Sequence, residues 1–245
     1  MKTSSQIILG LLLILISAIF YIIHYVIFRD LHHIVIYLIG DIAFVFIEVL
    51  LVTLIIHKLL SERETRVKLE KLNMVIGAFF SEVGTDLLIY MSNADPNLDK
   101  IKKDLIVTDN WAEKEFGSVK NRLKQYHYGV DILHINLIDL RSHLIQKRDF
   151  LLRLLENPVL LEHESFTRLL QAVFHMTEEL HCREDLDNLP DTDYKHLTGD
   201  INRAYGQLVY QWLEYIKYLK SDYPYLFSLA MRTNPFDKES SPIVR

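Results

Sequence analysis

The sequence predicts an all-α protein in which a transmembrane helical hairpin is followed by a cytoplasmic helical bundle. Three observations predict this fold class. Two long apolar runs open the chain, charged residues become frequent only after residue 57, and helical spacing then continues without strand-like alternation. We therefore divide the chain into a two-pass transmembrane hairpin (1–57), a cytoplasmic all-helical domain (58–232) and a C-terminal tail (233–245).

The hairpin prediction depends on the length of the two apolar runs. Residues 7–28 carry no formal charge, and residues 34–56 carry only two acids. Roughly 20 apolar residues, at about 1.5 Å of rise each, span the hydrocarbon layer of a bilayer, so both runs are long enough. A cleavable signal peptide is the alternative for the first run. The sequence does not favour it, because no small-x-small cleavage site precedes the second run.

The orientation of the hairpin follows from the basic residues at its ends. The connection at residues 29–33 is short, so the two helices must be antiparallel neighbours, and it contains one basic residue, Arg29. Basic residues are much denser after the second run: Lys58, Arg63, Arg66, Lys68 and Lys71. The positive-inside rule therefore predicts a multi-pass protein of the cell membrane with both termini in the cytoplasm.

Two acids in the second run are the most informative residues of the hairpin. Asp41 and Glu48 are both unfavourable in hydrocarbon, so each should face protein or water. They stand seven residues apart and therefore share one face of the helix. Folding the hairpin about its short connection is expected to bring Asp41 into an outer polar cluster with Tyr21, His24 and Tyr37.

Glu48 differs from Asp41 because Leu13 and Ile14 stand opposite it, and neither offers a polar partner. A carboxyl at that depth is either neutral or paired with another copy of the chain, which favours a homo-oligomer. Two interpretations of the acids remain open. A ring of acids could line a path for a cation or a proton, or neutral carboxyls could fix helix packing through hydrogen bonds.

Beyond residue 57 the apolar residues recur at helical spacing. Leu72, Ile76 and Phe79, for example, fall on one helix face. We expect helices over residues 61–92, 110–125, 136–156, 162–183, 192–220 and 224–232. Residues 93–107, which include Asp-Pro-Asn, are expected to form a turn and a polar connection, and residues 126–133 are expected to be extended.

Three segments of the domain resemble a group of prokaryotic two-span proteins of unknown function. They are Leu-Leu-Glu-Asn-Pro at 154–158, His-Glu-Ser-Phe-Thr at 163–167, and the run from Tyr-Pro-Tyr to Asn-Pro-Phe at 223–236. The likeness also covers the second apolar run. The resemblance implies that two membrane helices followed by a C-terminal all-α domain recur in this group. It implies no activity and no site residues.

Histidines and acids gather in the region before residue 200. His175 stands three and four residues before Glu178 and Glu179, and His196 stands four before Asp200. An antiparallel turn between the two helices would bring Glu179 and His196 to similar levels. Such pairs on facing helices make His175, Glu179, His196 and Asp200 candidate metal ligands. Solvated or helix-capping side chains are the favoured interpretation, because the Glu-x-x-His order usual in bundle metal sites is missing.

Several function classes leave no signature in the chain. Glycine motifs for phosphates and dinucleotides are missing, as is a nucleophile elbow, so we expect no cofactor and find no support for an enzyme. A net charge of −5 without a basic stripe predicts no nucleic-acid partner. The one cysteine, Cys182, cannot form an intramolecular disulfide and is expected to be a buried or inert thiol.

The function that these features favour is an oligomeric ion-conducting or ion-coupled assembly in the lipid bilayer, organised by the helical domain. The alternative is a non-conducting, membrane-anchored interaction or sensor module. A membrane-tethered metal-binding bundle is the third interpretation. The sequence does not determine the permeant ion, the subunit number or the partner.

Overall fold

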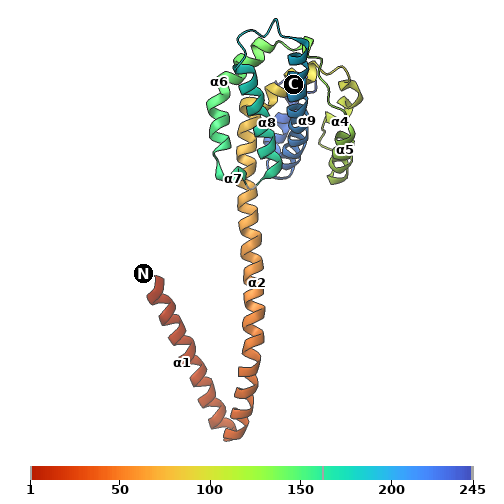
Figure 1. Ribbon diagram of the computed structural model, residues 1–245. Coiled ribbons are helices and arrows are strands. Elements are labelled where there is room, and N and C mark those ends of the chain that lie inside the picture. The colour runs from red at the N-terminus through yellow and green to blue at the C-terminus, as the bar shows by residue number, and fades with distance from the viewer. Residues whose placement is uncertain (1, 162, 244–245) are drawn as a thin grey trace. The chain divides into compact units, whose positions relative to one another are not determined.

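The structure, a computed structural model, describes residues 2–161 and 163–243, and all regular elements within these ranges are helical (Figure 1). The predicted all-α fold class is therefore confirmed. The chain divides into two compact units, Met1–Arg66 and Val67–Arg245.

The first unit consists of two helices joined by a tight turn. Helix α1 spans Lys2–Phe28. Helix α2 spans Leu31–Phe79 and therefore extends beyond the first unit. The turn is shorter than predicted, because Arg29 adopts a positive φ of 50° and donates its amide proton to the carbonyl oxygen of Tyr25 at 2.8 Å. The side chain of Asp30 then accepts from the amide of His33 at 3.2 Å, at the start of α2.

The side chains of the first unit are almost entirely exposed. Large apolar residues point outward all round both helices, as Phe46 illustrates with 75% of its surface exposed. Two helical stretches, Ile7–Phe28 and Leu31–Asn93, are long and apolar enough to cross a membrane by length and composition. The structure thus provides helices of the predicted kind, and their insertion in a membrane stays a prediction.

Helix α2 continues into the second unit without a break in helical structure. A π-helical turn, η1, occupies Phe80–Gly84, and helix α3 follows at Thr85–Asn93. The hydroxyl of Thr85 donates to the carbonyl oxygen of Phe80 at 2.8 Å, and the amide of Thr85 donates to the same oxygen, so this acceptor takes two hydrogen bonds at the end of the π-helical turn. Glycine is favoured at position 84, because a Cβ there would lie 2.7 Å from the ring of Phe80.

The remaining long helices of the second unit correspond to the predicted ones, with shifted ends, whereas the short helices were not predicted. The long helices are α5 (Glu113–Gln125), α6 (Leu137–Leu155), α8 (Glu164–His181), α9 (Asp191–Asp222) and α10 (Pro224–Arg232). The short ones are η2 (Leu98–Lys100), α4 (Lys102–Leu105), η3 (Ile132–His134) and α7 (Pro158–Leu161). Helix α6 begins after Asn136, whose side-chain oxygen accepts from the amides of Ile138 and Asp139 at 3.1 Å.

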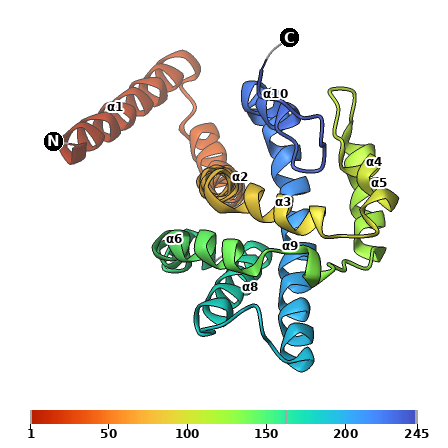
Figure 2. The same ribbon diagram turned by 90° about the horizontal axis from the view of Figure 1, so that it is seen from above.

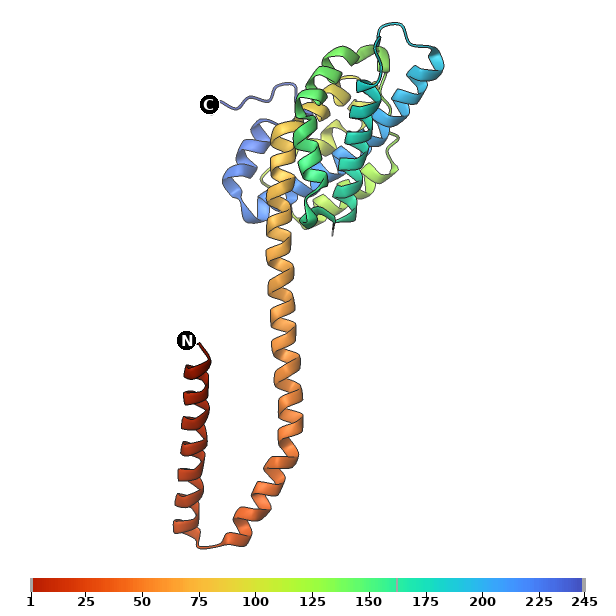
Figure 3. The same cartoon turned by 60° about the vertical axis from the view of Figure 1, so that its left-hand side comes forward.

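Helix α9 lies at the centre of the second unit. It packs against α3, α5, α8 and α10, while α6 packs on the other side of α8 (Figures 1 and 2). In Figure 3, α6 (green) and α8 (teal) lie side by side. The core includes the fully buried Phe166 of α8 and Tyr205 of α9. This arrangement fixes α8 and α9 as neighbours, which is what positions the site described below.

Three local expectations were wrong. The predicted polar connection at 93–107 contains two short helices and a buried side chain at Leu105, and part of 126–133 is helical rather than extended. The first residues of the predicted tail are also buried. Asn234 donates to the carbonyl oxygen of Leu105 at 2.8 Å, and the ring of Phe236 lies 5.0 Å from that of Trp212. Sequence patterns missed these contacts because they join segments that are far apart in the chain.

Candidate metal centre

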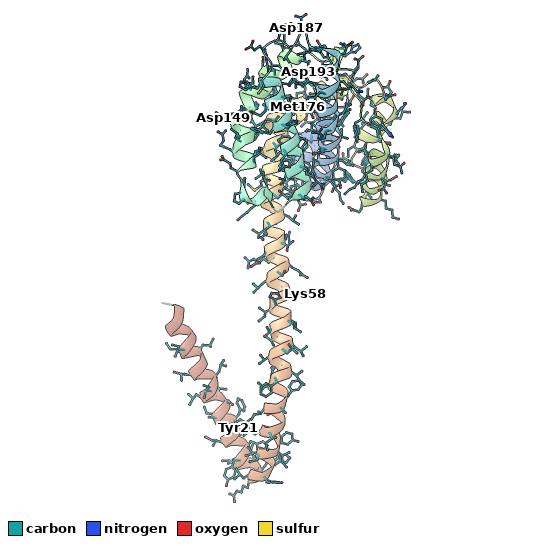
Figure 4. The ribbon with its side chains drawn as sticks, in the orientation of Figure 1. Tyr21, Lys58, Asp149, Met176, Asp187 and Asp193 are labelled. Carbon is teal, nitrogen blue, oxygen red and sulfur yellow. The ribbon has the colours of Figure 1, made fainter. Side chains whose placement is uncertain are left out.

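The candidate site lies between α8 and α9, which run antiparallel across the connection at residues 182–190. Helix α8 begins after His163, whose Nδ1 accepts from the amide of Phe166 at 3.3 Å. Its apolar face, marked by the buried Met176 in Figure 4, packs along the apolar face of α9. The polar edges of the two helices therefore meet beside the core.

Four side chains converge on this edge, two from each helix. His175 and Glu179 lie one turn apart on α8, and His196 and Asp200 lie one turn apart on α9. Their nitrogen and carboxylate oxygen atoms all lie within 4.8 Å of one another. The structure thus brings together all four residues that the sequence offered as metal ligands. We call them the His/acid cluster.

The separations between the ligand atoms are short and similar. Oδ2 of Asp200 lies 3.4 Å from Nε2 of His175 and 3.4 Å from Nε2 of His196. Oε2 of Glu179 lies 3.4 Å from Nε2 of His196, and Oε1 lies 3.8 Å from Nε2 of His175. Both imidazoles therefore present the same nitrogen to the same two carboxylates.

Asp200 is the most unusual member of the His/acid cluster, because only 2% of its side chain is exposed. Its Oδ1 pairs with Nη2 of Arg203 at 3.1 Å, whereas its Oδ2 is buried and has no hydrogen-bond partner in the described structure. A buried carboxylate oxygen without a partner costs free energy. This oxygen points at the two imidazoles, so an ion held there would supply the missing interaction.

Glu179 is held by a guanidinium group from the start of the α8–α9 connection. Nη1 of Arg183 lies 2.7 Å from Oε2 of Glu179, and its Nη2 lies 2.6 Å from Oδ1 of Asp193, which is labelled in Figure 4. The hydrogen bond from Arg183 lowers the pKa of Glu179 and also that of Asp193. Glu179 is thereby kept ionised, in the form that binds metal.

The two histidines leave the His/acid cluster open to solvent. The side chain of His175 is 47% exposed and that of His196 is 51% exposed. A metal ion could therefore reach the buried Asp200 carboxylate without any helix moving apart. Imidazole nitrogens and carboxylate oxygens together suit divalent transition metals.

Two nearby residues that the sequence offered take no part in the cluster. Glu178 pairs with Nε of Arg148 at 2.7 Å, on the side of α8 that faces α6. The thiol of Cys182 is exposed, because α8 ends at His181 and its last turn reaches the surface. The buried alternative for Cys182 was therefore wrong, and the inert alternative stays a prediction. Arg183 and Arg203 are the residues that sequence reasoning missed. Their spacing to Glu179 (i,i+4) and Asp200 (i,i+3) is the signal that could have found them.

The predicted polar residues of the first unit only partly come together. The ring of His33 stacks on His24 at 6.0 Å and meets Tyr37 edge-on at 4.6 Å. Together with Tyr21, which is labelled in Figure 4, His24 and Tyr37 line a groove of about 760 Å³ near the turn. Asp41 does not line this groove. His33 was not predicted, although it stands four residues before Tyr37 on the same helix face.

Asp41 and Glu48 lie beyond the groove on the exposed surface of α2. Within the part of the chain that the structure describes, neither carboxyl makes a hydrogen bond or an ion pair. Lys58, also labelled in Figure 4, lies further along the same helix.

The fold and the cluster define a class of protein in which an apolar helical pair precedes an all-α domain. The chain belongs to the MJ1433 family. Residues 68–232 match the model described as "Uncharacterized protein MJ1433, C-terminal helical domain", and residues 1–60 match "MJ1433, N-terminal helical domain".

A relative with these two domains is known from Methanocaldococcus jannaschii. The chain is 49% identical over 235 residues to "Uncharacterized protein MJ1433" of that organism, covering 96% of this chain and 94% of the relative. No solved structure matches the chain. The resemblance to a prokaryotic family with a C-terminal all-α domain is therefore confirmed, and the relative's name carries no activity.

Proposed function

We propose that this protein is a membrane-tethered metal-binding module. Its helical domain binds one divalent metal ion through His175, Glu179, His196 and Asp200. The observation that carries the proposal is the buried, unpartnered Oδ2 of Asp200, which lies 3.4 Å from Nε2 of both histidines. A buried carboxylate oxygen that accepts no hydrogen bond is unfavourable without an ion and favourable with one.

The membrane part of the proposal is supported by the first unit. Helices that are apolar all round expose surface that water solvates poorly, and a bilayer would remove that surface from water. The basic residues that follow residue 57 favour an orientation in which both termini, and with them the metal-binding domain, lie in the cytoplasm. The bound ion would then be drawn from the cytoplasmic pool.

Metal binding is tested on the full-length protein in detergent micelles after treatment with a chelator. Isothermal titration with a divalent transition-metal chloride is expected to show one ion per chain. Substituting His175→Ala and His196→Ala should each weaken binding at least about tenfold, because each removes a direct ligand. The matched control is His134→Ala, which removes an exposed histidine paired with Asp131 at 2.8 Å, away from the cluster.

Two results would contradict metal binding at this site. One is a wild-type protein that takes up no ion. The other is an affinity that falls as much in His134→Ala as in the two ligand variants.

Membrane topology is tested through the single cysteine of the chain, whose thiol is exposed in the helical domain. A membrane-impermeant maleimide should label Cys182 in inside-out vesicles and spare it in intact cells. The protein should also stay with the membrane pellet after alkaline carbonate extraction. Labelling of intact cells would reverse the proposed orientation, and release by carbonate would remove the membrane anchor.

A second candidate function, ion conduction or ion coupling, is favoured by a different observation. Asp41 and Glu48 are exposed carboxyls without partners in an apolar stretch, seven residues apart on one face of α2. Several copies of the chain could turn these acids toward a shared axis and pass a cation or a proton.

Conduction is tested by ion flux into liposomes that contain the purified protein. Asp41→Asn and Glu48→Gln should abolish the flux, while Asp30→Asn, in the turn between α1 and α2, should leave it unchanged. Flux that persists in both acid variants would exclude these acids as the path. Absence of flux under all gradients would leave the protein as a non-conducting tethered module.

A further inference from the structure

We infer that the ion of the His/acid cluster is zinc-like: it is bound in four-coordinate, tetrahedral geometry by two imidazoles and two singly coordinating carboxylates, which Arg183 and Arg203 hold in position. This inference rests on the proposed metal-binding function. It adds the class of metal, the coordination number and the role of two arginines.

The shortest separations within the cluster match the edges of a tetrahedron, and all four donor atoms lie within 4.8 Å of one another. Zinc binds histidine nitrogen and carboxylate oxygen at roughly 2.0–2.1 Å, which makes the edge between two ligands of a tetrahedron about 3.3–3.4 Å. The two edges from Oδ2 of Asp200 to the imidazoles both measure 3.4 Å, and the Glu179–His175 edge measures 3.8 Å. Adjacent ligands of an octahedral magnesium ion, with bonds of about 2.0–2.1 Å, would lie closer, at about 2.9 Å.

The two arginines limit how many oxygen atoms the carboxylates can offer. Arg203 occupies Oδ1 of Asp200, so only Oδ2 faces the imidazoles. Arg183 occupies Oε2 of Glu179 at 2.7 Å and leaves Oε1 without a guanidinium partner. If each carboxylate gives one oxygen and each histidine one nitrogen, the protein supplies four donor atoms. Calcium takes six to eight oxygen ligands, so this set is too small and too rich in nitrogen for it.

The kind of donor atom narrows the metal further. Two imidazole nitrogens disfavour magnesium and calcium, which prefer carboxylates, carbonyls and water. Copper(II) and nickel(II) favour tetragonal arrangements, whereas zinc has no geometric preference of its own and accepts a tetrahedron readily. Of these ions, zinc therefore fits the cluster best, and cobalt is its spectroscopic substitute.

The arginines also explain how the cluster persists without an ion. Two carboxylates close together repel each other, and the guanidinium groups of Arg183 and Arg203 offset that repulsion from outside the cluster. Arg183 pairs with Asp193 as well, so its position is fixed across the α8–α9 connection. Both arginines are thus positioning residues, which orient the carboxylates and do not themselves touch the ion.

The test uses full-length protein in detergent, stripped of metal and titrated with Co²⁺. Four-coordinate Co²⁺ absorbs strongly in the visible region and six-coordinate Co²⁺ only weakly, so intense bands that saturate at one Co²⁺ per chain are expected. Zn²⁺ should displace the Co²⁺ and abolish the bands, whereas Mg²⁺ and Ca²⁺ in large excess should not.

Arg203→Ala tests the positioning role, because it frees Oδ1 of Asp200. The affinity for Zn²⁺ should fall roughly 10–100-fold with one ion still bound, and the Co²⁺ bands should weaken as the carboxylate begins to coordinate through both oxygens. Arg203→Lys should recover part of the affinity. The matched control is Arg168→Ala, an exposed arginine of α8 that pairs with Glu164 at 3.5 Å.

The outcomes separate this inference from the proposed function. One bound Co²⁺ with the weak bands of a six-coordinate ion would overturn the tetrahedral site and leave metal binding intact. Unchanged Co²⁺ bands in Arg203→Ala would overturn the positioning role. Absence of any bound metal would overturn both the inference and the proposed function.

Discussion

The two units of this chain are both helical and rich in apolar residues, yet they place these side chains differently. In the second unit the apolar residues turn inward, as Phe166 does with none of its surface exposed. In the first unit they cover the whole helix surface, as Phe46 does with 75% exposed. The difference teaches that the second unit buries its own apolar side chains, whereas the first unit leaves them exposed on every side.

The acids of the two units show the same contrast. The buried carboxylates of the second unit have polar neighbours: Asp95 accepts from the hydroxyl of Tyr126 at 2.7 Å, and Asp200 pairs with Arg203. Asp41 and Glu48, in the first unit, have no partner among the described residues. Among the described residues, the buried carboxylate oxygens of the second unit thus have partners within the unit, except Oδ2 of Asp200, which accepts no hydrogen bond.

The largest effect that would sharpen this comparison is expected from two matched phenylalanine substitutions. Phe166→Ala should lower the free energy of unfolding of the domain by about 3–5 kcal/mol, because it opens a cavity in a closed core. Phe46→Ala should leave that free energy unchanged. Urea denaturation in detergent, followed by tryptophan fluorescence, measures this directly, since Trp111 and Trp212 both belong to the second unit. Equal losses from both substitutions would refute the contrast.

The second effect concerns partnered and unpartnered acids. Tyr126→Phe removes the hydroxyl that donates to Asp95, whose side chain is buried, and should cost the domain about 1–3 kcal/mol. Tyr37→Phe, on the apolar part of α2, should cost nothing in the same fluorescence assay. If Tyr126→Phe leaves the free energy of unfolding unchanged, water replaces the hydroxyl and the domain does not depend on this partner.

The third effect compares two glycines on the same long helical stretch. At Gly84 a Cβ would lie 2.8 Å from the ring of Phe79, and overpacking costs about 1–3 kcal/mol. Alanine recovers up to about 1 kcal/mol through its helix propensity, so Gly84→Ala should destabilise the domain by about 1 kcal/mol. Gly40 has no atom within 4 Å of such a Cβ and lies outside the domain, so Gly40→Ala should leave the free energy of unfolding of the domain unchanged. A higher free energy of unfolding in the Gly84→Ala variant would show that the π-helical turn adapts freely to the added methyl group.

The smallest effect concerns pH: it is absent at neutral pH, and the stability of the domain changes only in alkaline solution. Burial and the neighbouring Asp95 raise the pKa of Tyr126, and burial raises the pKa of Tyr128 and Tyr205. The folded domain therefore holds these phenolic protons after the unfolded chain has released its own, near the ordinary pKa of about 10. Stability should be constant up to about that pH and fall above it. A constant free energy of unfolding up to pH 12 would contradict these shifts.

Much of the fold could be predicted from the sequence because the decisive signals are local. The uncharged stretch 7–28 and the helical spacing after residue 57 predicted the helices of both units. Asn136 and the Asn-Pro at 157–158 marked the ends of one helix closely. The contacts of Asn234 and Phe236 could not be predicted, because they depend on segments more than twenty residues away.

The sequence predicted which residues belong to the candidate site, but it did not predict that they come together. Spacing of three and four residues placed His175 and Glu179 on one helix face and His196 and Asp200 on another. The spacing left open whether the two faces meet, and the missing Glu-x-x-His order argued against a metal. The structure brings the faces together and buries one oxygen of Asp200, which no spacing rule could indicate.

The sequence by itself determined that this chain is helical throughout, that its first part is apolar on all sides, and which residues could serve as ligands. Each of these properties depends on neighbours within a turn or two of helix, so the order of residues is sufficient. Only the tertiary structure decided that α8 and α9 face each other with their polar edges aligned. That decision depends on how the apolar faces of α3, α5, α8 and α10 pack around α9, a balance of long-range contacts that no single segment encodes.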